Sequence, residues 1–360
     1  MIKLNKQKNP LGLENRLNDA SLFIKEEFGL EISESQLKHY SKEQWKEFCN
    51  ANGFEKKCDG VYIPKSLIAY VNESSKFIVS DSFHEYFGHG LFCEHSIIGQ
   101  ELVKSEQKGE DSYKYLFDIN TIITSGLTRR NIDNYEGFAT WMEALLCKET
   151  GNNKIWEMKK EKLPRERIDL LEYFRLYEHA MTKYGLMAQM GFPKRYEPSK
   201  IVNVVKALYG KHFKEIESII AYGSKKPYSD IDLFIVSKEA SGEFFNGWLD
   251  IYQTNKGNFE KGIKLLDISM TDPLFSGELI YGSKDEFNRL KKEILCKPIS
   301  QESVTHNSQC ADNQRKYIKN ELNERDRKRA ETYSKSYESN ARALSNGVKP
   351  LTYSMLKNLL

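Results

Sequence analysis

The stretch IIAYGSKKPYSDIDLFIVS, residues 219–237, decides how the second half of the chain is expected to fold. Its two ends are apolar and rich in β-branched residues, as in strands, and Gly223-Ser224 opens a turn between them. Asp230 and Asp232 alternate with apolar residues at the start of the second strand. Because successive side chains of a strand point to opposite faces, we expect both carboxylates on one face.

Two neighbouring carboxylates predict a cation. They repel each other, so folding them together without an ion is costly. A pair of Mg²⁺ ions would neutralise them and hold a nucleoside triphosphate for in-line attack. Gly223 lets the backbone approach phosphate oxygens. The alternative is a DxD pair that ends a strand on the solvent face and binds nothing.

The pattern resembles the G-S…D-x-D signature of the DNA polymerase β-like nucleotidyltransferase superfamily, most closely its kanamycin-nucleotidyltransferase-like branch. The likeness spans about residues 200–298. It implies that Asp230 and Asp232 bind the metal pair. It also implies a third carboxylate on a neighbouring strand, Asp250 in WLDIYQ, which joins one metal and accepts the proton of the attacking hydroxyl.

The turn before the DxD pair carries a second implication of this resemblance. Gly223 and Ser224 would bind the triphosphate. Only the five residues KKPYS separate Ser224 from Asp230, a shorter interval than in many relatives. A tighter loop would alter the grip on the nucleotide or mark a lost activity.

A different metal-binding pattern lies in HEYFGHG, residues 84–90. In the HExxH helix of zinc hydrolases, the histidines stand four residues apart and about 40° apart around the axis. His84 and His89 are five apart, about 140° in a regular helix. A π-type bulge absorbs one extra residue, and Gly88 tolerates the backbone that it requires. The spacing therefore predicts a π-bulge if the histidines share an ion.

HEYFGH resembles the HExxGH motif of the dipeptidyl peptidase III family of zinc peptidases. The resemblance implies that His84 and His89 bind zinc, that Glu85 activates water, and that Glu136 in the later segment EGFA is the third ligand. Tyr135 stands where the family has another glutamate. Three such ligands leave one zinc position open for water, whose pKa the metal lowers toward neutrality.

Other interpretations of this region stay open. Asp133 or Asn134 could cap a helix, which would put Glu136 in its first turn, where a carboxylate favours the dipole in any case. His179 could stabilise a tetrahedral oxyanion, but a surface helix explains it equally. Further acidic and imidazole groups lie nearby in the sequence: Glu94, His95 and Glu143.

The chain of 360 residues exceeds the usual size of one domain, so we expect several. A mainly α, zinc-metallopeptidase-like domain is expected over residues 1–197, with helices in 13–53 and strands at 61–72 and 76–80. The segment GFPKRYEPSK breaks helical continuity. A nucleotidyltransferase domain with an α/β fold and a mixed sheet should follow over 198–298, and a basic helical tail over 299–360. One charged helix is expected over 315–344.

Composition describes an ordinary globular protein, with 39% hydrophobic and 29% charged residues and a net charge of +3. From residue 311 onward, eleven Lys and Arg face six Asp and Glu, so the basic excess is local. That end could contact RNA or be a solvated face. Six cysteines without a CxxC pair predict reduced thiols. No apolar leader or span occurs, so we expect a cytoplasmic protein without a membrane partner.

The two motifs together predict a bifunctional chain. A Mg²⁺-dependent transferase would place a nucleoside monophosphate on a hydroxyl of a protein, an RNA or a small molecule, and a Zn²⁺ peptidase would cut a peptide or protein. One alternative makes the nucleotidyltransferase fold a nucleotide-sensing or antitoxin-like module that controls the protease. Another is a pseudo-peptidase that only binds metal or peptide.

Overall fold

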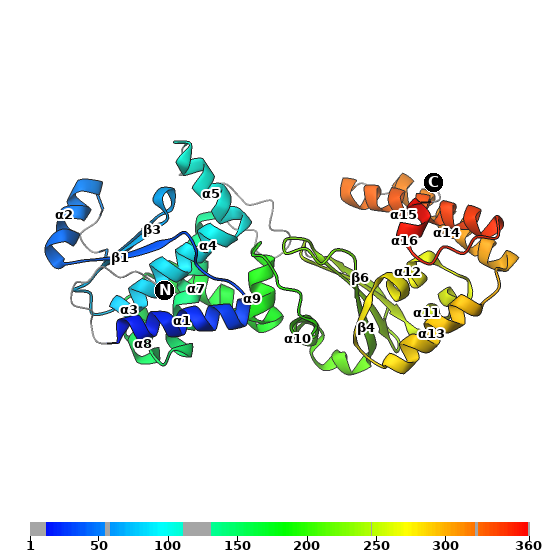
Figure 1. Ribbon diagram of the computed structural model, residues 1–360, viewed down its shortest axis with the longest axis horizontal. Coiled ribbons are helices and arrows are strands. Elements are labelled where there is room, and N and C mark those ends of the chain that lie inside the picture. The colour runs from blue at the N-terminus through cyan, green and yellow to red at the C-terminus, as the bar shows by residue number, and fades with distance from the viewer. Residues whose placement is uncertain (1–11, 55–57, 111–130, 246, 321–322, 359–360) are drawn as a thin grey trace. The chain divides into compact units, whose positions relative to one another are not determined.

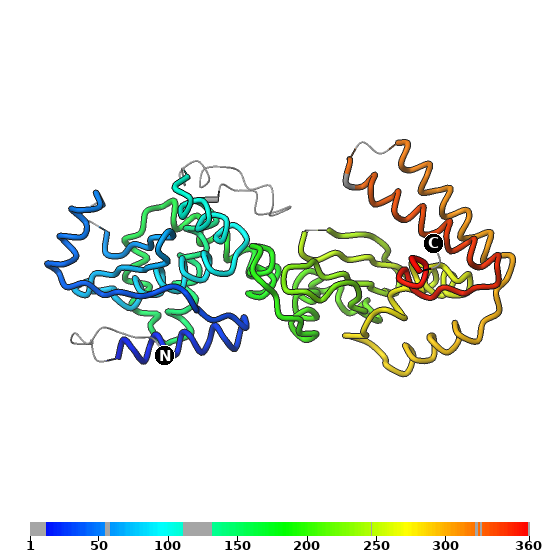
Figure 2. Tube along the Cα trace, turned by 45° about the horizontal axis from the view of Figure 1, so that its top comes forward, coloured from blue at the N-terminus to red at the C-terminus, as the bar shows by residue number. Residues whose placement is uncertain are grey.

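The computed structural model describes residues 12–54, 58–110, 131–245, 247–320 and 323–358. The chain divides into two compact units, residues 1–208 with 226–228 and residues 209–225 with 229–360 (Figures 1 and 2). Each unit is described by itself. The domain limits at residues 197 and 298 remain predictions.

The first unit is mainly helical. Its helices are α1 (Leu13–Phe28), α2 (Lys42–Asn52), α3 (Ile78–Ser82), α4 (Gly90–His95), α5 (Ile97–Gln107), α7 (Asn131–Glu149), α8 (Asn153–Lys160), α9 (Arg165–Gln189) and α10 (Pro198–Tyr209), with the 3₁₀ turn η1 (Pro64–Ser66) and the π-helix η2 (Phe83–His89). Large apolar side chains from η2, α4 and α7 form its core, among them Phe83, Phe92, Phe138 and Trp141. Burial of these aromatic rings supplies much of the driving force for this unit.

A three-stranded sheet accompanies these helices: β1 (Gln36–Tyr40), β2 (Gly60–Ile63) and β3 (Ile68–Asn72), in the order β1-β3-β2. Residues 36–40 were expected in a helix, and that prediction was wrong. They pair in parallel with β3, and the helix begins only after Ser41, which forms a capping box with Gln44. Tertiary pairing here overrides a helix-like spacing of apolar residues.

The expected strand at residues 76–80 is also wrong, because it contains the start of α3. Ser75 Oγ accepts a hydrogen bond from the Phe77 N–H at 3.1 Å and donates one to Asp81 at 2.6 Å, which organises the turn into the helix. A short apolar run does not distinguish a strand from a buried helix. The segments α3, η2 and α4 then follow one another without a gap.

The second unit contains a five-stranded mixed sheet in the order β6-β7-β5-β4-β8. Its strands are β4 (Ile216–Tyr222), β5 (Ile231–Ser237), β6 (Gly242–Phe245), β7 (Leu249–Asn255) and β8 (Glu278–Tyr281). Among these five strands, β5 and β7 pair in parallel and the other neighbouring pairs are antiparallel. Strand β6 was not anticipated; its mostly exposed residues lack the apolar pattern of the other strands.

Helices complete the second unit: η3 (Gly210–Glu215), α11 (Lys256–Lys264), α12 (Ile268–Ser276), α13 (Lys284–Cys296), α14 (Gln301–Asn320), α15 (Glu324–Ser345) and α16 (Tyr353–Lys357). The single helix expected over 315–344 is instead divided between α14 and α15, which pack against each other (Figure 2). Leu344 of α15 lies in the same core as Phe234 of β5. The basic C-terminal segment is therefore packed on the sheet.

None of the helices within the described ranges combines the length and the apolar character that crossing a bilayer requires.

Candidate functional site

The carboxylates of the second unit meet at the start of two parallel strands. β5 and β7 pair in a register that places Asp232 beside Asp250, and Asp230 precedes β5 by one residue. Carboxylate oxygens of all three lie within 4.8 Å of one another. Burial raises the pKa of Asp232 to about 6, and the negative charges of Asp230 and Asp250 add to the rise. This mutual repulsion is what a bound cation would relieve.

Gly223 brings the preceding turn directly against this cluster. Its φ is 72°, and a Cβ there would lie 2.1 Å from Asp232 Oδ2, so only glycine fits. The next residue, Ser224, is exposed, and its Oγ lies 3.1 Å from Ser229 Oγ. The turn therefore presents backbone and a hydroxyl beside the carboxylates.

A cavity of about 780 Å³ opens from Asp232. Sheet residues line one side, including Tyr222, Phe245 and Tyr252, and α14, α15 and α16 contribute Tyr317, Arg329, Tyr333, Tyr337 and Tyr353. The Arg329 guanidinium carbon lies 3.6 Å from the centre of the Phe245 ring, a cation–π contact. Among the described residues, the lining thus combines aromatic faces with the Arg329 guanidinium and, besides Asp232, the carboxylates of Glu243 and Asp326.

Sequence reasoning missed this wall. Arg329, Tyr333 and Tyr337 are spaced by four residues and so share one face of α15. That spacing could have been recognised in the sequence as a functional face. Nothing in the sequence alone places it opposite Asp232.

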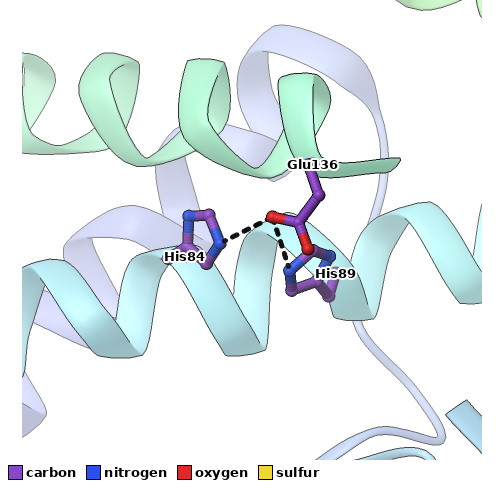
Figure 3. A group of neighbouring side chains, drawn as sticks. All are labelled: His84, His89 and Glu136. Carbon is purple, nitrogen blue, oxygen red and sulfur yellow. Dashed lines mark ion pairs between the residues drawn. The ribbon is translucent and has the colours of Figure 1, made fainter. Parts of the chain in front are cut away.

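In the first unit, η2 has the π geometry that the histidine spacing predicts. The imidazole rings of His84 and His89 lie 4.8 Å apart and perpendicular. Glu136 of α7 points between them, with Oε2 at 3.7 Å from His84 Nε2 and 3.9 Å from His89 Nε2 (Figure 3). α7 begins by Asn131, so neither Asp133 nor Asn134 caps it, and that alternative was wrong.

The structure explains the glycine at position 88 by packing, and not by the backbone conformation that the sequence suggested. A Cβ there would lie 2.7 Å from the Cα of Ala139, so the glycine lets α7 approach η2 closely. Gly60 of β2 similarly leaves room for the Glu85 side chain, whose Cγ would lie 2.7 Å from a Cβ at that position. Both glycines serve packing around the histidines.

Buried partners orient the two histidines. His84 Nδ1 lies 3.0 Å from Glu143 Oε2, which leaves Nε2 facing Glu136. Burial alone would raise the pKa of Glu143, but the Lys159 charge and the His84 hydrogen bond lower it to about 2. Tyr135 stacks on His89 with ring centres 3.9 Å apart. A carboxylate behind a metal-facing histidine is a common arrangement in zinc sites.

The two imidazoles differ in protonation. Burial acts to lower the pKa of His84, but hydrogen bonds with Glu136 and Glu143 raise it to about 9, so this ring must release its proton before it can bind a metal. Burial lowers the pKa of His89 to about 3, so its imidazole is neutral at pH 7. Burial raises the pKa of Glu85 to about 7, against the effect of His84, so this carboxylate is poised to exchange a proton. Glu85 Oε2 lies 4.0 Å from His89 Nε2.

Arg167 of α9, which the sequence did not single out, also reaches this cluster. Its guanidinium nitrogens lie 3.0 Å from His84 Nε2 and 2.8 Å from Glu136 Oε2. The donor set and spacing fit zinc, whose tetrahedral ligands stand about 3.4 Å apart. Arg167 must withdraw to admit the ion, and its side chain is 35% exposed and long enough to do so.

The remaining candidates lie elsewhere. His179 is exposed on α9, as a surface helix predicts. Glu94 accepts hydrogen bonds from the Ser33 and Ser35 N–H groups at 2.8 and 2.6 Å. His95 Nε2 lies 2.8 Å from the Glu31 carbonyl oxygen. These two groups hold the segment before β1.

Comparisons with known proteins give little further guidance. No family model and no curated protein matches the chain. A nucleotidyltransferase-like protein from Exiguobacterium sibiricum 255-15 is similar in structure, with 14% identity and a TM-score of 0.26, over 41% of this chain and 58% of that one. The chain thus covers somewhat more than half of that structure. At this identity and TM-score the likeness carries no assignment of the site.

Proposed function

We propose that the second unit transfers a nucleoside monophosphate from a nucleoside triphosphate to a hydroxyl of a protein, an RNA or a small molecule, with release of pyrophosphate. The convergence of Asp230, Asp232 and Asp250 beside a cavity carries this proposal. Mg²⁺ ions held by these carboxylates would neutralise charge on the attacking and leaving oxygens.

Other residues of the second unit would accept the proton and bind the nucleotide. Asp250 accepts the proton of the attacking hydroxyl, and the turn at Gly223 and Ser224 contacts the triphosphate. Arg329 adds positive charge on the opposite wall. The tyrosines offer flat faces on which a base stacks, a contact worth about 1–3 kcal/mol.

A thermal-shift titration with each triphosphate and Mg²⁺ tests the proposal. A ligand that binds only the native state raises its melting temperature. We expect a shift for the wild type and for Asp285→Asn, an exposed carboxylate on α13, and none for Asp230→Asn/Asp232→Asn. Equal shifts in all three proteins would refute the proposal. A shift without transfer of labelled nucleotide to any acceptor would instead support the sensor alternative.

We infer a second activity for the first unit, zinc-dependent peptide hydrolysis. Its support is the π-helix, which directs two imidazoles and Glu136 toward one point. Zinc would supply a water molecule of lowered pKa. Glu85 would then act as the base for that water, and the buried Glu143 holds the orientation of His84.

Metal analysis separates this proposal from its alternatives. His84→Ala should lose zinc, whereas His179→Ala, on the exposed face of α9, should keep it. Glu85→Gln should keep zinc and lose turnover on a peptide pool, since it removes a base and no ligand. Full zinc content in a folded His84→Ala would disprove the site. Zinc without turnover in the wild type would identify a pseudo-peptidase.

A further inference from the structure

A third cluster of metal-binding side chains lies in the second unit, apart from the carboxylates described above. Asp267 caps the N-terminus of α12, and His306 and Cys310 stand four residues apart on one face of α14. His306 Nε2 lies 2.9 Å from Asp267 Oδ2 and 3.6 Å from Cys310 Sγ. One ligand atom of each lies within 4.8 Å of the others.

The three side chains converge on one point. The same imidazole nitrogen, His306 Nε2, faces both the carboxylate of Asp267 and the thiol of Cys310. Around tetrahedral zinc, bonds of about 2.3 Å to sulfur and 2.0–2.1 Å to nitrogen put the two ligands about 3.5 Å apart. The observed 3.6 Å matches that separation, and the nitrogen–oxygen pair needs to open by about half an ångström.

The carboxylate is held in place for such a role. Asp267 Oδ1 accepts hydrogen bonds from the Ser269 N–H at 2.9 Å, from Ser269 Oγ at 2.8 Å and from the Tyr337 hydroxyl at 3.1 Å. Oδ2 is thereby aimed at His306. Outer hydrogen bonds of this kind orient the ligands of metal sites.

An ion has a route to the cluster. Asp267 and His306 line a cleft of about 510 Å³, together with Glu243 and Lys261, and the His306 side chain is 24% exposed. The cleft also leaves space for water as a fourth ligand.

We propose that Asp267, His306 and Cys310 bind a thiophilic divalent ion, Zn²⁺ or a similar transition metal, with water in the fourth position. An oxygen, nitrogen and thiolate set favours zinc over Mg²⁺. The ion would join α14 to α12. Because Tyr337 both bonds Asp267 and lines the cavity near Asp232, metal binding would also stiffen that wall.

Cobalt absorption tests the proposal in the full-length, reduced protein. Co²⁺ bound to a thiolate gives a charge-transfer band in the near ultraviolet, and the His84, His89 and Glu136 cluster contains no sulfur that could produce one. We expect the band in the wild type and in Cys296→Ser, a matched change at an exposed cysteine of α13. Cys310→Ser should lose it while keeping the wild-type circular dichroism spectrum.

Two further variants sharpen the outcome. His306→Gln should weaken cobalt binding at least tenfold. Asp230→Asn/Asp232→Asn should retain the band, which separates this site from the proposed transferase. Absence of the band in the wild type at saturating Co²⁺, or its persistence in Cys310→Ser, would overturn the proposal.

Discussion

Gly88 shows how one residue sets the geometry of the histidine cluster. Because a Cβ at this position would lie 2.7 Å from the Ala139 Cα, Gly88→Ala must move α7 away from η2. We expect a loss of about 1–3 kcal/mol in unfolding free energy, as for other overpacked contacts. Glu136 moves with α7, so zinc affinity should fall as well. Chemical denaturation and zinc titration measure both effects.

Gly242→Ala is the matched control for this change, because a Cβ there meets no atom within 4 Å. It should leave stability and zinc binding near the wild-type values. Unchanged zinc affinity in Gly88→Ala would show that the close approach of α7 does not position Glu136.

His39 gives the first unit a dependence on pH. Burial lowers its pKa from 6.5 to about 4, so the folded state binds the proton more weakly than the unfolded state. Protonation therefore favours unfolding, and stability should be complete above pH 6.5 and fall as the pH drops from about 6.5 to about 4. His39→Gln, which can keep a polar contact with Ser82 Oγ, should flatten that fall.

Urea denaturation at a series of pH values measures this effect, with His212→Gln at an exposed position as the control. The same pH dependence in the wild type and in His39→Gln would rule out His39 as its source.

At the scale of elements, α15 differs most from its expected role: the sequence predicted part of a charged helix, and in the structure this helix lines the cavity. Arg329 lines the cavity near Asp232, so Arg329→Ala should weaken binding of a Mg²⁺–triphosphate complex about tenfold, or about 1.4 kcal/mol. Arg327, which is exposed on the same helix, provides the control. Isothermal calorimetry measures both variants. Equal losses in the two would indicate a diffuse charge effect, contrary to a specific role for Arg329.

Local patterns explain what could be predicted from the sequence. The β4 and β5 strands, the shared position of Asp230 and Asp232, and the π segment at His84–His89 each follow from a spacing within one short stretch. Pairing Asp250 with Asp232 required the family resemblance as well.

Contacts between distant segments explain what could not be predicted. β1 forms because β3 lies beside it and pairs with it in parallel. Arg167 and Arg329 reach their clusters from helices far along the chain. A single sequence carries no signal for contacts between residues so far apart in the chain, so the positions of Arg167 and Arg329 follow only from the structure.

For the whole molecule, the proposed ligands should leave separate footprints in hydrogen exchange. Zinc should slow exchange in η2 and α7, and through the third cluster in α12 and α14, because ligand binding lowers the population of open states. Mg²⁺ with a triphosphate should slow exchange in β5, β7 and α15. A zinc footprint confined to η2 and α7 would contradict the third site, and one absent from them would contradict the first.

The wall of the large cavity consists of residues that a ribosome makes at very different times. Asp232 lines this cavity, and Asp250 follows beside it in β7, whereas Tyr353 is made about 100 residues after Asp250, an interval of roughly 5–20 s at usual elongation rates. In that interval a nascent chain carries its acidic cluster on an open sheet. It cannot yet enclose a ligand, so newly made chains gain a complete cavity only when their last helices have been synthesised.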